Sequence, residues 1–183
     1  MKKIFVLCMS LMMAFTLVAC GKSEDVKTYA SATEVLETMI NKEELEFPFM
    51  GGGFENITEN APAQVKESDV TFINSFGIKD DMIKEVKDIA SMTHMMNQNT
   101  FNAAAVVLND GEDAKAFAKE IETNLKATQW VCGAPSILYI FDCGNNTLVC
   151  MYGDEEVAGL MKEKATKFLT GSTVLSETSL VEE

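Results

Sequence analysis

The second half of the chain alternates apolar runs of strand length with amphipathic helices, and this order restricts the fold more than any other feature. Residues 103–108 form a continuous apolar run that ends at Asn109-Asp110-Gly111, as a buried strand does. In the segment that follows, apolar residues recur at helical spacing from Ala114 to Leu125. We therefore expect a buried strand, a turn and an amphipathic helix in succession.

Two more strands and a second helix follow. Residues 137–143 and 148–152 are β-type runs joined through Gly144-Asn145-Asn146, whose residue types tolerate positive φ. From Asp154 to Phe168 an apolar face recurs at helical spacing, with acids at the start and lysines toward the end, as the helix dipole favours. Within residues 80–98 we expect a helical turn and then an extended segment.

From residue 86 the expected order is therefore strand, strand, helix, strand, strand, helix. This order predicts an α+β fold in which an antiparallel sheet has its helices packed on one face. Such a two-layer sandwich includes ferredoxin-like arrangements. We expect N-terminal helices to precede it.

The N-terminal segment has the parts of a secretory signal peptide. Lys2 and Lys3 precede an apolar run from residue 4 to residue 19. As a helix this run would span about 24 Å, less than the roughly 30 Å hydrocarbon core of a bilayer. Leu17-Val18-Ala19-Cys20 resembles the lipobox of bacterial lipoproteins. The resemblance implies cleavage before Cys20, a diacylglycerol thioether with palmitate-like chains on that residue, and attachment to the outer, extracytoplasmic face of the cell membrane.

Local signals divide the remaining chain. Ser31 and Glu34 form a capping box for a helix that reaches about Lys42. Residues 45–67 lack a period and are expected to form a loop, after which Ser68 caps a short helix that Gly77 ends. The expected segments are a signal peptide (1–19), a lipidated tether (20–30), a helix with a Gly/Pro-containing loop (31–67), an α+β domain (68–170) and a disordered tail (171–183).

The charge pattern argues against a nucleic-acid partner. The chain has 28 acidic residues, 15 lysines and no arginine, and its net charge is −13. All the acids follow Cys20, whereas Lys2 and Lys3 precede it, so the part after Cys20 is more acidic than the whole. Nucleic-acid binding needs a basic surface, and docking on anionic lipid needs clustered Lys or Arg. The expected link to the membrane is therefore the diacylglycerol on Cys20.

Three cysteines lie beyond Cys20, namely Cys132, Cys143 and Cys150, and their spacing matches no zinc motif. If Asn145-Asn146 is a two-residue turn, the Cβ atoms of Cys143 and Cys150 are diagonal neighbours up to about 7–8 Å apart. If the loop has three residues, the two side chains point to opposite faces. A disulfide needs Cβ atoms about 3.5–4.5 Å apart. We therefore predict no Cys143–Cys150 bond, and we leave the pairing of Cys132 open.

Each candidate for chemistry has a structural alternative. His94, the only histidine, lies in a Met-rich stretch that could offer soft ligands to Cu(I). A turn or strand end with buried methionines and an exposed His explains the stretch more simply, because Met is abundant throughout the chain. Paired carboxylates at Asp80-Asp81, Glu43-Glu44 and Asp154-Glu155-Glu156 could act on glycans only if two faced each other across a cleft. At helix starts, such acids serve the dipole.

Two apolar features are also more simply structural. Gly51-Gly52-Gly53 lacks the spacing of a phosphate loop, and the nearby Phe47, Phe49 and Phe54 either form a latch for a partner or cover the sheet. Trp130 is expected to cap the core, because no polar group supports a ligand site there. We therefore assign no catalytic, cofactor-binding or metal-binding residue, and Cys20 is the one site residue.

The order of elements over residues 69–169 resembles the "domain of unknown function 4358" family of small lipoproteins from low-GC Gram-positive bacteria. The resemblance rests on Phe76-Gly77-Ile78, the strand at 103–108, the helix at 110–125, the Gly144-Asn145 hairpin and the helix at 154–168. Asn102 and Asn146 depart from the pattern, since the family has Glu and Tyr there. The family has no established activity, so the resemblance implies only a surface lipoprotein.

The sequence thus predicts a lipid-anchored, non-enzymatic module that binds another envelope protein or a cell-wall component. Two alternatives stay open. One is an envelope enzyme with unidentified carboxylates, and the other is a small-molecule or metal-binding lipoprotein that uses the Met/His stretch or the loop at 45–67. A concave pocket with converging polar groups would favour an enzyme or a ligand binder, and an exposed apolar patch would favour an interaction module.

Overall fold

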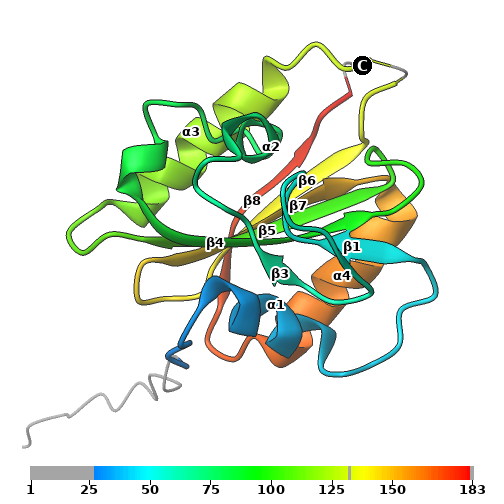
Figure 1. Cartoon of the computed structure of the whole chain (residues 1–183), viewed down its shortest axis with the longest axis horizontal. Coiled ribbons are helices and arrows are strands. Elements are labelled where there is room, and N and C mark those ends of the chain that lie inside the picture. Colours follow the sequence, from blue (N-terminus) through cyan, green and yellow to red (C-terminus); the bar gives the residue numbers. More distant parts are fainter. Residues whose placement is uncertain (1–26, 132, 182–183) are drawn as a thin grey trace, which may run out of the picture.

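An antiparallel sheet crosses the middle of the molecule, and helices lie on both of its faces (Figure 1). The structure is a computed structural model that describes residues 27–131 and 133–181. The signal peptide, Cys20, most of the expected tether and Cys132 lie outside these ranges. Across the described residues the strands are β1 (Phe49–Gly51), β2 (Thr58–Glu59), β3 (Ala63–Gln64), β4 (Val86–His94), β5 (Phe101–Leu108), β6 (Ile137–Asp142), β7 (Thr147–Gly153) and β8 (Thr173–Ser179).

The helices confirm the α+β class. They are α1 (Ala32–Ile40), α2 (Val70–Asn74), the 3₁₀ turn η1 (Ile83–Glu85), α3 (Ala114–Lys126) and α4 (Glu155–Phe168). The strand order is β2-β1-β4-β5-β7-β6-β8, with β3 also paired to β4, and every pair is antiparallel. The helical turn and extended segment expected within 80–98 are η1 and β4.

The sheet has a hydrophobic core on each face. On one face Phe72 of α2, Phe76 just after it and Ile121 of α3 pack against Val106 and Leu148. On the other face α1 and α4 pack against a second set of sheet residues. This second cluster includes Leu36, Met39, Met161, Ala105, Val149 and Met151. The expectation that all helices pack on one face is therefore wrong, and the molecule has three layers.

The connections explain why α3 and α4 lie on opposite faces. The chain passes from β5 through α3 to β6 across the intervening β7, and from β7 through α4 to β8 across the intervening β6. Both connections move across the sheet in the same direction, toward β8, but β5 and β7, from which they start, run antiparallel to each other. Crossovers of the usual right hand then require helices on opposite faces. A ferredoxin-like order is not confirmed, because it would place β8 beside β5 rather than beside β6.

The segment 45–67, expected to be a loop, adds three short strands to the sheet. Gly51 of β1 lies opposite Met92 of β4, and Ala63 of β3 lies opposite Ser91. Strands of two or three residues are too short to show a periodic pattern in the sequence. Backbone pairing with β4, rather than a local pattern, therefore makes β1 and β3 extended. Residues 31–67 thus share the sheet and its core with the expected α+β domain.

The C-terminal segment, expected to be a disordered tail, contains β8. This strand pairs with β6 from Ile137 opposite Ser179 to Asp142 opposite Thr173. Leu175 and Leu180 pack against the core on the α2/α3 face. Most of the other side chains of β8 are polar or exposed, as suits an edge strand with one free side. Because these residues form no apolar run, the sequence pattern did not predict the strand.

Several helix ends match the sequence signals. Ser31 Oγ accepts a hydrogen bond of 3.2 Å from Glu34 N at the start of α1, and Asp154 Oδ1 accepts one of 2.8 Å from Val157 N at the start of α4. The expected cap of α2 is wrong by one residue, because Asp69 precedes the helix and Ser68 Oγ instead donates to Glu55.

The β6–β7 hairpin has the three-residue loop Gly144-Asn145-Asn146, because Cys143 N donates to Thr147 O at 2.8 Å. All three loop residues have positive φ. In this register Cys143 belongs to the α1/α4 core and Cys150 to the α2/α3 core. Both thiols are free, so the predicted absence of a Cys143–Cys150 disulfide is confirmed.

Candidate functional site

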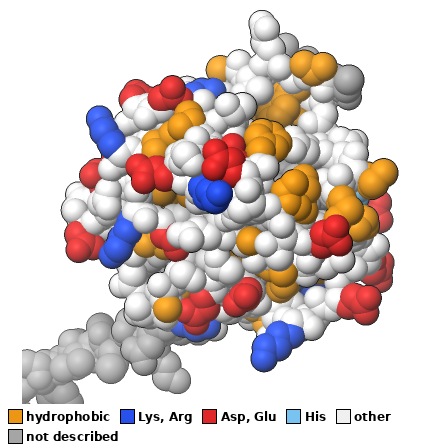
Figure 2. Space-filling view, viewed as in Figure 1, with side chains coloured by type: hydrophobic (Ala, Val, Ile, Leu, Met, Phe, Trp, Pro, Cys, Tyr) orange, Lys and Arg blue, Asp and Glu red, His pale blue; other side chains and the backbone are white. Residues whose placement is uncertain are grey.

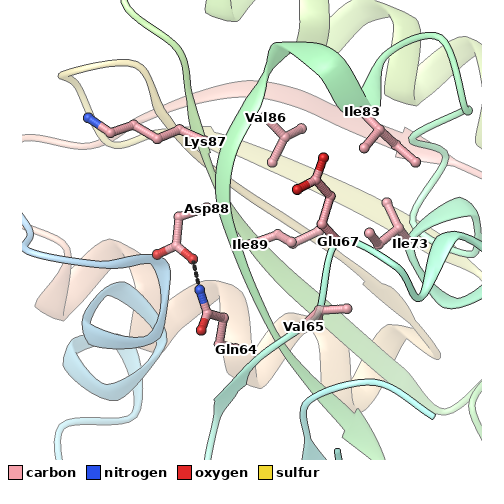
Figure 3. Close-up of a pocket in the computed structure, with 9 residues that line it drawn as sticks. All are labelled: Gln64, Val65, Glu67, Ile73, Ile83, Val86, Lys87, Asp88 and Ile89. Atoms are coloured by element: carbon pink, nitrogen blue, oxygen red, sulfur yellow. Dashed lines mark hydrogen bonds between the residues drawn. The ribbon is translucent and has the colours of Figure 1, made fainter. Parts of the chain in front are cut away.

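A cavity of about 130 Å³ opens beside the first half of β4 (Figure 3). Its aliphatic walls come from β4, from α2, from η1 and from the segment after β3, and they are Val65, Ile73, Ile83, Val86 and Ile89. Polar side chains complete the lining, namely Gln64, Glu67, Lys87 and Asp88.

The local backbone creates this opening. Ala90 pairs with Gln64 of β3, and Val65 N donates to Ile89 O at 2.8 Å, but the chain then turns toward α2. Among the described residues, no strand pairs with Val86–Asp88 on this side. The register with β5 also shifts between Val86 and Asp88, as in a β-bulge. Bulges redirect side chains at sheet edges, and here the bulge lies at the cavity.

Two carboxylates at the cavity have different surroundings. Asp88 accepts hydrogen bonds from Gln64 Nε2 at 2.9 Å and from Ala32 N at 2.7 Å, so it is engaged in holding the fold. The Glu67 side chain extends over the aliphatic walls toward Val86 and Ile83, whereas Lys87 points away (Figure 3). Within residues 27–131 and 133–181, Glu67 has no ion pair and no side-chain hydrogen bond. Glu67 and Lys87 are thus the lining charges without an ion pair among the described residues, and of these two Glu67 extends over the aliphatic walls.

The carboxylate pairs singled out in the sequence make separate local contacts. Asp80 accepts a hydrogen bond of 2.9 Å from Asn74 Nδ2, and Asp154 caps α4. Glu43 pairs with Lys164, whose hydrogen bond lowers the pKa of this exposed carboxyl. The expected role of such acids at helix starts is confirmed for Asp154 and for Glu155 and Glu156, which lie exposed in the first turn of α4.

His94 ends β4, where its ring stacks on Phe47 with centroids 5.7 Å apart. Its Nδ1 accepts hydrogen bonds from the backbone N–H groups of Met96 and Asn97, at 3.2 and 3.1 Å. Met92 is buried, but Met95 and Met96 are exposed, so the expected burial of the methionines holds only in part. In the described part of the chain, no three His, Cys, Asp or Glu side chains are grouped to hold a metal.

The glycine run allows a close backbone approach. A Cβ on Gly51 would overlap the backbone of Ala61 and Ala63, and one on Gly53 would overlap the Asp69 side chain. Phe47 and Phe49 pack on the α1/α4 core, as the covering alternative predicts. Phe54 is 58% exposed, although its ring contacts Phe72 edge-on at 5.1 Å.

Trp130 contributes to the core, as expected. Its ring lies 5.5 Å from that of Tyr152 and covers the α2/α3 core from outside. The two Asn residues that depart from the family pattern make local hydrogen bonds: Asn102 Nδ2 donates to Gln98 O, and Asn146 Nδ2 donates to Asn109 O at 3.0 Å.

The two described thiols are unsuited to nucleophilic chemistry. Burial raises the pKa of Cys143 and of Cys150 to about 12. A thiol with such a pKa stays protonated at neutral pH, and the thiolate is the nucleophile.

The surface mixes both charge signs with exposed apolar side chains, and apolar groups gather on the right side of the face in Figure 2. Over the whole described surface, the large exposed apolar residues are Phe54, Ile57, Met95, Met96, Val131, Leu160, Val174 and Val181. None of the described helices is both long and apolar enough to span a bilayer.

Glu67 was missed by reasoning from the sequence, because it lies in the segment taken as a loop and belongs to no motif. Comparison of the chain with family models, curated proteins and solved structures found no match. The resemblance to the lipoprotein family therefore stays a prediction.

Proposed function

We propose that this protein is a lipid-anchored extracytoplasmic lipoprotein whose folded part is a non-enzymatic binding module. The observation that carries the binding role is the cavity beside β4, with its aliphatic walls and one free carboxylate. The anchor is the diacylglycerol on Cys20, supported by the Leu17-Val18-Ala19-Cys20 motif. The resemblance to a family of surface lipoproteins agrees with this proposal.

The cavity favours binding over catalysis. Acid–base catalysis needs two groups that converge on the reacting atoms. Here Glu67 alone extends over the walls, Asp88 is engaged with Gln64 and Ala32, and Lys87 points away. Aliphatic walls beside one carboxylate that has no ion pair among the described residues suit the recognition of a small ligand.

Metabolic labelling tests the anchor. Bacteria that express the full chain are grown with an alkyne analogue of palmitate, and label on the protein is measured after click chemistry. We expect label on the wild type and on the matched variant Cys8→Ala, whose cysteine lies inside the signal segment. We expect none on Cys20→Ala. Label that persists on Cys20→Ala would contradict the proposed attachment site.

Methyl NMR tests the cavity. The full chain is reconstituted in lipid nanodiscs with labelled isoleucine δ-methyl groups, and n-pentanol is the ligand. Signals of Ile73, Ile83 and Ile89, which line the cavity, should shift, whereas those of Ile40 and Ile140 should not. Val86→Trp should fill the cavity and abolish the shifts. Val174→Trp, on the exposed edge strand, should preserve them.

A further inference from the structure

We infer that the cavity beside β4 binds the aliphatic ammonium group of a ligand, with Glu67 as its counter-ion. This inference rests on the proposed function, since it names the chemical class that the binding site accepts.

The size and walls select a short alkyl chain. An apolar cavity of about 150 Å³ accommodates a molecule the size of benzene. The cavity beside β4 has a volume of about 130 Å³, so it suits an alkyl chain of about four or five carbons. Its aliphatic walls, formed by Ile73, Ile83 and Val86 among others, offer contacts to methylene groups.

The charges select a cation at the end of that chain. Glu67 extends over the walls and has no ion pair among the described residues. Because Glu67 is exposed, its attraction for a cation is modest, and contacts of the alkyl chain with the walls must hold the ammonium group beside it. The net charge of −13 also repels anionic ligands. A ligand carboxylate at Glu67 would meet a charge of the same sign, and Lys87, although it lines the cavity, extends away from Glu67 (Figure 3).

Two sources present this chemistry. One is a free alkyl amine, and the other is a lysine side chain on an extended peptide. Because Val86–Asp88 has no strand partner on the cavity side among the described residues, a peptide backbone could pair with this edge while its lysine entered the cavity. Both sources place an ammonium group at Glu67.

The test compares three ligands of equal chain length on the full chain in nanodiscs: n-pentylamine, n-pentanol and pentanoate. Affinity is measured from the isoleucine methyl shifts. We expect pentylamine to bind about fivefold tighter than pentanol, a modest factor because Glu67 is exposed, and pentanoate to bind weakest. Glu67→Gln should remove the preference for the amine and leave pentanol binding unchanged. The matched variant Glu120→Gln, an exposed carboxylate on α3, should change neither.

The outcomes separate the inference from the proposed function. Equal binding of pentylamine and pentanol, or an amine preference that survives Glu67→Gln, overturns the ammonium inference and leaves the cavity as a binding site. Failure of every ligand to shift the methyl signals overturns both. The last ligand measured is N-acetyl-lysine methylamide, which represents a peptide lysine. If it binds more tightly than pentylamine, a peptide lysine is the source of the ammonium group, and if it binds more weakly, a free amine is.

Discussion

The Asp88 carboxylate binds the first residue of α1: its Oδ2 accepts a hydrogen bond of 2.7 Å from Ala32 N. The N–H groups in the first turn of a helix have no partner within the helix, and the positive end of the helix dipole favours a negative charge there. The other oxygen of Asp88 accepts from Gln64 Nε2 at 2.9 Å. One side chain therefore joins α1, β3 and β4 at the rim of the candidate site.

Asp88→Ala is expected to lower the free energy of unfolding by about 1–3 kcal/mol, because it leaves the Ala32 N–H without its charged acceptor. Urea denaturation measures the change. Asp88→Asn, which can still accept one hydrogen bond, should lose less. Asp110→Ala is the control, since this exposed residue makes no side-chain hydrogen bond within the described structure. Equal stability of Asp88→Ala and Asp110→Ala would show that the contact with α1 does not stabilise the fold.

Alkaline pH is expected to destabilise the protein through its buried thiols. Burial raises the pKa of Cys143 and Cys150 from 9.0 to about 12. Between these values the unfolded chain has released both protons while the folded chain keeps them, so the free energy of unfolding falls as pH rises. At about pH 10.5 the loss is on the order of 2 kcal/mol for each thiol.

The double variant Cys143→Ala/Cys150→Ala tests this pH dependence. Urea midpoints measured from about pH 7.5 to 10.5 should fall less steeply for the variant than for the wild type. Some slope should remain, because burial also raises the pKa of Tyr29 to about 12. Identical slopes for the two proteins would show that the thiols ionise equally in both states.

Two glycines are expected to respond oppositely to the same substitution. Gly51→Ala should destabilise the protein by about 2 kcal/mol or more, because its Cβ would overlap the backbone next to β3. Gly159→Ala in α4 meets open space and should stabilise by up to about 1 kcal/mol, through higher helix propensity. Thermal unfolding compares the two. A neutral Gly51→Ala would contradict the close approach of β1 and β3.

Adjacent residues after β8 test whether the C-terminal segment belongs to the core. Leu180 is 9% exposed and Val181 is 48% exposed. Leu180→Ala should cost about 2 kcal/mol or more, since it removes buried methyl groups, whereas Val181→Ala should change stability by less than about 0.5 kcal/mol. Urea denaturation measures both variants. If both were neutral, the segment would behave as the disordered tail expected from the sequence.

The two-sided core was the main feature missed, although the sequence carried a signal for it. The apolar stretches in β5 and β7 are continuous rather than alternating, and every residue of β7 is buried. A strand that is apolar on both sides must be covered on both faces. Reading these runs as buried strands was correct. The prediction that all helices share one face was inconsistent with them.

The sequence by itself determined the local elements whose signals lie within a few residues of each other. Ser31 and Asp154 cap their helices, the apolar spacing from Ala114 to Leu125 forms one face of α3, and the Gly144-Asn145-Asn146 loop joins its strands. These features depend on hydrogen bonds and side-chain contacts between near neighbours.

Only the tertiary structure decided where those elements meet. The strands β1, β3 and β8 exist because β4 and β6 offer free backbone groups along their edges, and no local period marks them. The same holds for the candidate site, since Glu67 and Val86 are 19 positions apart in the chain. They line one cavity because β3 ends at Gln64 while β4 continues past it. Partners so distant in sequence are selected by packing, which local patterns do not record.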